Sequence, residues 1–331
     1  MTAKPRPSEF EIIARYFAPL AAGAPGAASL GDDVALISVG SGEELVLKTD
    51  TIVAGVHFIG DEPARLIARK LLRVNLSDLA AKGARPLGYL LAAVLPRDIE
   101  ESWIADFAAG LAEDQSQYGL SLLGGDTTAT PGPLTLSLTA LGTAARGRTP
   151  RRGDAKRGDS VLVSGTIGDS SFGLEVVRGR LGGLATLDAR HLQGRYQLPE
   201  PRLALGRALV ESGVVHASMD ISDGLVADLG HVCEQSGLGA EIFWNRIPLS
   251  AAARAALDLR PELRSRVLGG GEDYELLITV ADHDVARAIE TAARTGVSLT
   301  AIGTMQAGAG VTVRGEDGAA IAVPNPGFQH F

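Results

Sequence analysis

Residues 74–83 read Val74-Asn75-Leu76-Ser77-Asp78-Leu79-Ala80-Ala81-Lys82-Gly83 and end a helix that we predict to begin near Pro63. Leucines recur at helical spacing through this region, so one face of the helix is apolar. Asn75 and Asp78 are three residues apart and share a face close to the apolar side. A carboxylate in that position is costly unless a cation meets it. Two cations come into question, Lys82 in an ordinary helix-surface pair or a metal ion.

Composition restricts the class of protein. A chain of 331 residues that is 45% apolar and 21% charged is long enough for two domains of an ordinary globular protein. The net charge of −8 disfavours a nucleic-acid partner. No secretory pattern opens the chain, no apolar run is long enough to cross a membrane, and Cys233 is the single cysteine. We therefore expect a cytoplasmic protein with no membrane partner.

Helical and strand patterns mix throughout the chain, which predicts an α/β or mixed α+β protein in two lobes. The basic, turn-rich stretch from Ala144 to Arg157 marks the expected boundary, giving domains 1–145 and 146–331. Expected helices cover residues 9–17, 63–83, 100–118, 201–212, 224–235 and 284–294, and another follows Ser170. A weak hairpin is expected before the C-terminal tail. Expected strands cover residues 44–48, 86–95, 120–123, 134–140, 160–163, 214–219, 274–280 and 299–302.

Aspartates recur close to glycine, serine or threonine, and most of them follow expected strands. They are Asp33, Asp50, Asp126, Asp220 and Asp223, and Asp78 joins them from its helix. Strand ends are where α/β folds place their sites, although a single Gly-Asp is an ordinary turn. Carboxylate and hydroxyl oxygens are the ligands that Mg²⁺ prefers. The recurrence therefore favours a magnesium site over a set of unrelated turns.

Several common chemistries lack their motifs. The sequence has no G-x-x-x-x-G-K-[ST], no G-x-G-x-x-G between a strand and a helix, no histidine pair at zinc spacing and no G-x-S-x-G. His57 lies in a glycine-flanked loop, where ligand contact and packing are equally open. Arg151 and Arg152 are either a solvated basic linker or a phosphate clamp.

The motifs together resemble the thiamine-monophosphate kinase family of the aminoimidazole-ribonucleotide synthetase-like superfamily, from Phe10 to Phe331. The stretches that carry the resemblance are Gly31-Asp32-Asp33, Lys48-Thr49-Asp50-Thr51, Val74–Gly83, Gly124-Gly125-Asp126-Thr127-Thr128, Asp220-Ile221-Ser222-Asp223-Gly224 and Gly270-Gly271-Glu272-Asp273-Tyr274-Glu275. The resemblance implies transfer of the γ-phosphoryl group of ATP to thiamine monophosphate, giving thiamine diphosphate, with several Mg²⁺ ions. It also implies a homodimer whose N-terminal lobes form a joint β-barrel, with the active site near the lobe interface.

The resemblance also assigns roles to residues. The implied metal ligands are Asp33, Thr49, Asp50, Asp78, Asp126, Asp220 and Asp223, and of these Asp50, Asp126 and Asp220 are the expected catalytic residues. The implied ATP-binding residues are Gly125, Asp126, Arg152 and Ser222. The implied substrate-binding residues are His57, Glu272, Asn325 and Phe328.

Two positions depart from the family pattern. Lys48 stands where relatives often have serine, and an ammonium group cannot be a metal ligand. Asn325 stands where some relatives have a stacking Trp or Tyr, and Phe328 is the candidate replacement for that ring.

The motifs supply several carboxylates but no general base, and the implied reaction explains why none is needed. Thiamine monophosphate carries a phosphate whose second pKa is about 6, so it is already a nucleophile at neutral pH. The difficulty is to bring two anions together, and metal ions solve it by neutralisation and alignment. The alternatives are another ATP-dependent enzyme of the superfamily and a non-catalytic nucleotide- or metal-binding protein. Two enzymes of the superfamily, selenophosphate synthetase and the carbamoyl-dehydrating maturation factor, need a reactive cysteine near the N-terminus and at the C-terminus, respectively. The single cysteine of this chain, Cys233, is at neither position.

Overall fold

The computed structural model describes residues 9–30, 35 and 37–328. The chain divides into two compact units, unit 1 with Met1–Leu79 and Arg85–Arg146, and unit 2 with Ala80–Ala84 and Gly147–Phe331. Among the helices of the described chain, none combines the length and apolar character that crossing a bilayer requires.

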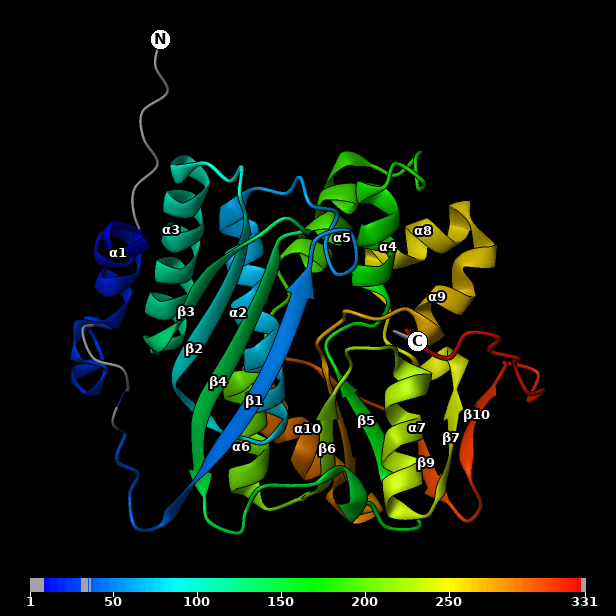
Figure 1. Cartoon of the computed structure of the whole chain (residues 1–331). Coiled ribbons are helices and arrows are strands. Elements are labelled where there is room, and N and C mark those ends of the chain that lie inside the picture. The colour runs from blue at the N-terminus through cyan, green and yellow to red at the C-terminus, as the bar shows by residue number, and fades with distance from the viewer. Residues whose placement is uncertain (1–8, 31–34, 36, 329–331) are drawn as a thin grey trace. The chain divides into compact units, whose positions relative to one another are not determined.

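Unit 1 is built on a four-stranded sheet in the order β1-β4-β2-β3 (Figure 1). Its strands are β1 (Glu43–Val53), β2 (Arg85–Pro96), β3 (Ser121–Thr130) and β4 (Thr135–Ala145). The β2–β3 pair is parallel and the other two pairs are antiparallel. Helices α2 (Ala64–Ala81) and α3 (Glu101–Tyr118) lie against one face of the sheet, and the short helix α1 (Glu9–Ile12) begins the described chain.

Alternation along β1 and β4 separates the two faces of this sheet. In β4, Leu136, Leu138 and Ala140 are buried on the helix side, because successive side chains of a strand point to opposite faces. On β1, Leu45 and Leu47 are exposed on the open side. The leucines of α2 that the pattern predicted to be apolar core are buried completely at 71, 72, 76 and 79.

A buried ion pair fastens α2 to α3. Asp114 is fully buried, and its two carboxylate oxygens accept hydrogen bonds from Arg73 at 2.7 and 3.0 Å. Arg69 adds a third contact at 2.9 Å. A buried carboxylate is tolerated when it is paired in this way, so the face of α2 that carries Asp78 is held in a fixed position.

Unit 2 contains a six-stranded sheet in the order β10-β7-β9-β5-β8-β6. The strands are β5 (Ser160–Ser164), β6 (Val215–Asp220), β7 (Gly239–Phe243), β8 (Leu276–Val280), β9 (Leu299–Gln306) and β10 (Gly310–Arg314). The helices are α4 (Asp169–Val177), α5 (Thr186–Gln197), α6 (Leu203–Ser212), α7 (Leu225–Ser236), α8 (Ala251–Leu259), α9 (Arg264–Gly269) and α10 (Val285–Ala293).

Two apolar clusters lie on the two sides of this second sheet. One joins Phe172 of α4 and Leu229 of α7 to Val163 of β5. The other joins Leu209 of α6 and Ala288 of α10 to Leu162, the neighbouring residue of the same strand. The strand expected at residues 160–163 is present as β5, and it is buried on both faces.

Strands β1, β3, β4 and β9 all continue beyond their expected ends, and two of these ends concern site residues. β1 continues to Val53 and β3 continues to Thr130, so Asp50 and Asp126 lie inside strands instead of after them. Pairing overrides the local turn signal in both cases: Asp50 pairs with Leu138 of β4, and Asp126 pairs with Ala92 of β2. Asp220 is the last residue of β6, as expected.

Candidate active site

In unit 1, Asp50 and Asp78 converge on one cation. The Lys48 Nζ lies 3.2 Å from Asp50 Oδ1 and 2.9 Å from Asp78 Oδ2. Lys48 and Asp50 are two residues apart on β1 and share its helix-side face, while Asp78 comes from α2. The cation that meets Asp78 therefore comes from β1, a partner that helix spacing does not suggest.

Lys82, the partner considered from the sequence, has other contacts. Its Nζ donates to the carbonyl oxygens of Ser218 at 2.6 Å and Pro150 at 3.2 Å, both within unit 2. Lys82 thus binds the end of α2 to the strand β6 that leads to Asp220.

Thr49 and Asp50 present their side chains to opposite faces of β1. The Thr49 hydroxyl donates to the carbonyl of Leu138 at 3.1 Å and accepts from Thr139 at 3.0 Å. The Thr49 hydroxyl is therefore engaged with β4, on the face opposite to the Asp50 carboxylate.

His57 is held by the loop that follows β1. Its Nδ1 accepts the Val53 N–H at 3.1 Å, and its own carbonyl accepts from the buried Lys70 at 3.3 Å. A ring nitrogen that accepts must be unprotonated, so the hydrogen of the ring sits on Nε2. The loop therefore fixes both the orientation and the tautomer of this side chain.

Gly125 and Asp126 lie on the open face of the sheet of unit 1. They line a hollow of about 650 Å³ together with Phe17, Ala92 and Thr139. Gly125 is required by close packing, since a Cβ there would lie 1.9 Å from the carbonyl oxygen of Leu91. Strands β1 and β3 are the two edges of the sheet, roughly 14 Å apart at the usual strand spacing. Unit 1 alone does not bring Asp126 to Asp50.

In unit 2, the loop after β6 and the glycine-rich loop before β8 cross closely. The Glu272 N–H donates to Ser222 O at 2.7 Å, and the Tyr274 N–H donates to Ile221 O at 2.8 Å. Gly271 permits this approach, because a Cβ there would lie 2.4 Å from Ser222 O. The crossing places the predicted nucleotide residue Ser222 beside the predicted substrate residue Glu272.

The glycine-rich loop is strained. Glu272 has φ 74° and Tyr274 has φ 51°, in the left-handed region that side chains other than glycine, asparagine and aspartate rarely adopt. Such strain persists only where the surroundings enforce it, and it concentrates at functional sites.

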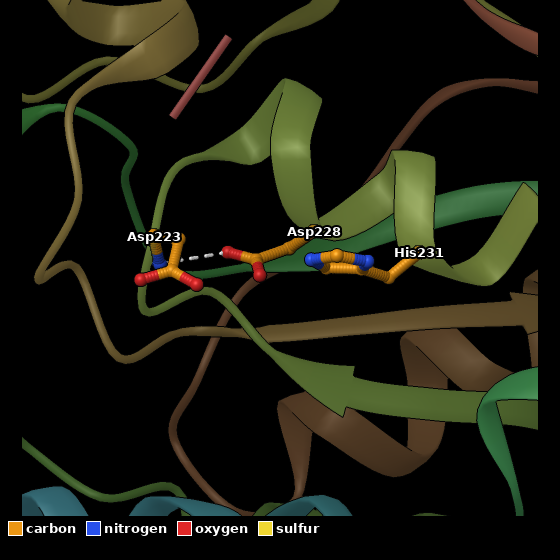
Figure 2. A group of neighbouring side chains, drawn as sticks. All are labelled: Asp223, Asp228 and His231. Carbon is orange, nitrogen blue, oxygen red and sulfur yellow. Dashed lines mark hydrogen bonds between the residues drawn. The ribbon is translucent and has the colours of Figure 1, made fainter. Parts of the chain in front are cut away.

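Asp228 organises the loop that carries Ser222 and Asp223 (Figure 2). Its Oδ2 accepts the N–H groups of Ser222, Asp223 and Gly224 at 3.0, 3.0 and 3.1 Å. Burial raises the pKa of Asp228 to about 7, while these donors act in the opposite direction. Asp228 is not among the residues predicted from the sequence, although an acid in the first turn of a helix is a known capping signal.

Asp223, Asp228 and His231 form a close group on α7 and the loop before it. One ligand atom of each lies within 4.8 Å of the others, an arrangement able to hold a cation (Figure 2). Asp228 uses one oxygen for the loop, so Asp223 is the member best placed to serve a bound metal.

The C-terminal segment of the described chain packs against the same loop. The Phe328 N–H donates to Asp223 O at 3.0 Å, and the Ala227 N–H donates to Pro326 O at 3.0 Å. Asn325 lies against Gly269, where a Cβ would come within 1.9 Å of the Asn325 carbonyl oxygen. The Phe328 side chain is 49% exposed, so its ring is accessible beside Asp223.

Arg152 is not brought to Ser222 within unit 2. Its carbonyl accepts from Ser236 at the end of α7, whereas Ser222 precedes the start of that helix. The twelve residues of α7 span about 18 Å. Asp33 lies outside the described residues.

The comparisons with known proteins agree with this architecture. The family described as AIR synthase related protein, N-terminal domain, matches residues 31–144, and its C-terminal domain matches residues 156–316. A thiamine-monophosphate kinase of Caulobacter vibrioides is 44% identical over 311 residues, covering 92% of this chain and 86% of that protein.

Two solved structures are similar over most of the chain. The thiamine-monophosphate kinase of Stenotrophomonas maltophilia K279a has a TM-score of 0.80 at 41% identity, covering 88% of this chain and 91% of that one. AaThiL, solved as a complex with AMPPCP and TMP, has a TM-score of 0.78 at 31% identity over 91% of both chains.

The two-part match and the two-unit fold define an AIR synthase related protein, as predicted. Within that class, the chain belongs to the thiamine-monophosphate kinase family. The family and fold class expected from the motifs, and with them the phosphotransferase class of enzyme, are confirmed.

Proposed function

We propose that this chain transfers the γ-phosphoryl group of ATP to thiamine monophosphate and releases ADP and thiamine diphosphate. The observation that carries the proposal is the structural similarity to AaThiL, which was solved as a complex with AMPPCP and TMP. The similarity covers 91% of both chains. The crossing of the Ser222 and Glu272 loops supports it, because a nucleotide residue and a substrate residue become neighbours there.

The residues fit magnesium chemistry. Asp220 and Asp223 offer carboxylate oxygens on one loop, and Asp126 offers another on β3, a donor set that Mg²⁺ prefers. We propose these three as metal ligands, together with Asp33, Thr49 and Asp50. Asp78 shares a cation with Asp50. Bound Mg²⁺ would neutralise and align the phosphates of both reactants.

The remaining residues bind and orient the reactants. Ser222 and Gly125 lie on tightly packed backbone that is suited to approach by a nucleotide. Arg152, which does not lie beside Ser222 in unit 2, is proposed to bind a phosphate of ATP. His57, Glu272, Asn325 and Phe328 are proposed to bind thiamine monophosphate, with the exposed Phe328 ring available for stacking.

No general base is needed for this transfer. The acceptor phosphate of thiamine monophosphate is ionised at neutral pH and attacks directly, and catalysis consists of positioning and charge neutralisation. The acids of the site are proposed to bind metal ions, and the reaction does not require any of them to accept a proton.

We also propose that the protein is a homodimer formed through the open face of unit 1. Leu45, Leu47 and Leu90 are 42%, 62% and 40% exposed there, beside the hollow that holds Asp126. An apolar face of this kind is typical of an interface. A second copy would cover it and close the two sheets into a barrel. We place this enzyme in the cytoplasm, where its substrate and ATP occur together, as a further proposal.

A panel of acceptors tests the proposed reaction. The full chain is incubated with ATP, Mg²⁺ and thiamine monophosphate, thiamine, or aminoimidazole ribonucleotide precursors, and products are separated by chromatography. We expect thiamine diphosphate from thiamine monophosphate alone. Efficient conversion of free thiamine would contradict the absence of a base, and turnover of another acceptor would favour a different enzyme of the superfamily.

A further inference from the structure

The cation between Asp50 and Asp78 belongs to the chain itself. Lys48 Nζ lies 3.2 Å from Asp50 Oδ1 and 2.9 Å from Asp78 Oδ2, so one ammonium group contacts both carboxylates. All three side chains are partly buried, with exposed fractions of 29%, 36% and 21%. They lie between β1 and α2, where solvent screens their charges less than on an open surface.

An ammonium group suits this position. It is a compact charge with three donors, so it can satisfy two carboxylates at once. Without a cation, the two negative charges would repel each other. The backbone fixes the arrangement, since Lys48 and Asp50 share one face of β1 by alternation and α2 is fastened to α3 through Arg73 and Asp114.

A divalent ion would compete for the same oxygens. Mg²⁺ binds carboxylate oxygens at about 2.0–2.1 Å and requires near-octahedral surroundings. A bound Mg²⁺ that bridged Asp50 Oδ1 and Asp78 Oδ2 would occupy the space now taken by the Lys48 ammonium. The two cations exclude each other there.

We propose that the Lys48 ammonium takes the place of a divalent metal ion between Asp50 and Asp78, as a permanent internal counter-cation. The inference rests on the proposed function only in assigning Asp50 to the acids that serve the reaction. It narrows the role of Asp78, which holds the ammonium and leaves metal binding to the other acids. An internal cation does not dissociate, so one of the two negative charges is balanced at any magnesium concentration.

Counting Mn²⁺ ions bound to the folded full chain tests the proposal without turnover. Free Mn²⁺ is measured by electron paramagnetic resonance in the wild type, Lys48→Ser and Lys156→Ser, all without nucleotide. Lys156 is the matched control, because it is an exposed lysine of unit 2 whose Nζ contacts His216. We expect Lys48→Ser to bind one more Mn²⁺ per chain than the wild type and Lys156→Ser to bind the same number.

A double variant and melting curves complete the first experiment. Adding Asp78→Asn to Lys48→Ser should remove the extra Mn²⁺. Lys48→Ser alone should melt below the wild type without metal and recover when Mn²⁺ is added, whereas Lys156→Ser should not. An unchanged Mn²⁺ count in folded Lys48→Ser, verified by circular dichroism, would overturn the proposal.

A second measurement does not depend on the folding of Lys48→Ser. Wild type and Asp78→Asn are titrated with Mn²⁺ in the presence of AMPPCP. If Lys48 holds the position, both bind the same number of ions. Loss of one Mn²⁺ in Asp78→Asn would show that a metal displaces Lys48 and would overturn the inference. Failure of the acceptor panel would refute the proposed function and leave these ion counts unaffected.

Discussion

At the scale of the residue, Asp273 shows how burial acts on a single carboxyl group. It is 1% exposed and accepts the N–H groups of Gly168 at 2.7 Å and Ser170 at 3.3 Å. Burial, reinforced by the negative charge of Asp169, raises its pKa to about 8. The folded chain therefore holds this proton over a pH range in which the unfolded chain has lost it.

This pKa predicts a loss of stability as pH rises. The contribution of Asp273 is complete below the unfolded value of about 4 and disappears as pH approaches about 8, at up to about 1.4 kcal/mol per pH unit. Asp273→Asn, which keeps an accepting oxygen, should flatten this part of the profile. Urea unfolding at pH 5 and pH 8 measures the difference. Asp258→Asn, at an exposed residue, is the control. An equal change in the free energy of unfolding between pH 5 and pH 8 in the wild type and Asp273→Asn would refute the pKa assignment.

Asp50→Asn and Asp126→Asn test the acids of unit 1. Each change removes a charge and nearly preserves shape, so we expect the chain to fold and kcat to fall by about 10²-fold or more, as when one electrostatic element of a site is lost. Steady-state kinetics at a saturating magnesium concentration gives the value. Full activity in both variants would show that neither acid serves the reaction.

The sequence predicted the acids better than their surroundings. It placed Asp220 at the end of β6 and Asp78 near the buried side of its helix. It offered Lys82 or a metal as the partner of Asp78, because helix periodicity reveals neighbours along a helix and not those on another strand. Lys48 and Asp228 needed tertiary structure, since their contacts join separate elements or fold a loop back on itself.

At the scale of the element, the crossing of two loops in unit 2 depends on Gly271. A Cβ at this position would lie 2.4 Å from Ser222 O, a main-chain atom that cannot rotate away. Gly271→Ala should therefore separate the Ser222 and Glu272 loops, lower the melting temperature and reduce kcat/KM by about tenfold or more, as a displaced binding group does.

Gly182→Ala is the matched control for that change. Gly182 is exposed, its φ is not in the left-handed region, and a Cβ there would have nothing within 4 Å. Melting curves and kcat/KM with thiamine monophosphate are measured for both variants. Equal behaviour of Gly271→Ala and Gly182→Ala would mean that the close crossing is irrelevant to the site.

Elements with strong periodicity were predictable, and the ends of strands were not. Helices α2 and α3 follow the apolar spacing closely. Gly124-Gly125-Asp126 has the composition of a turn, yet it continues β3 because β2 pairs with it in parallel through Pro96 and Thr130. Strand β7 and helices α5, α8 and α9 were missed: β7, α8 and α9 are short, and α5 has few apolar residues, so its periodic signal is weak.

At the scale of the whole molecule, the open face of unit 1 predicts self-association. Leu47 is 62% exposed on β1, and a lysine there would place a charge in the proposed interface. Leu47→Lys should shift the mass measured by light scattering from dimer to monomer. Leu187→Lys, at a residue of unit 2 that is 77% exposed, should leave the mass unchanged. A dimer that persisted in Leu47→Lys would exclude this face.

The central claim is direct transfer of phosphate from ATP to thiamine monophosphate, and the fate of the γ-phosphorus tests it most directly. The full chain is mixed with γ-³²P-labelled ATP, Mg²⁺ and thiamine monophosphate in a single turnover, and the labelled species are separated. We predict that the label appears in the terminal phosphate of thiamine diphosphate at the rate at which ADP forms. Label released only as inorganic phosphate, with thiamine monophosphate unchanged, would contradict the account.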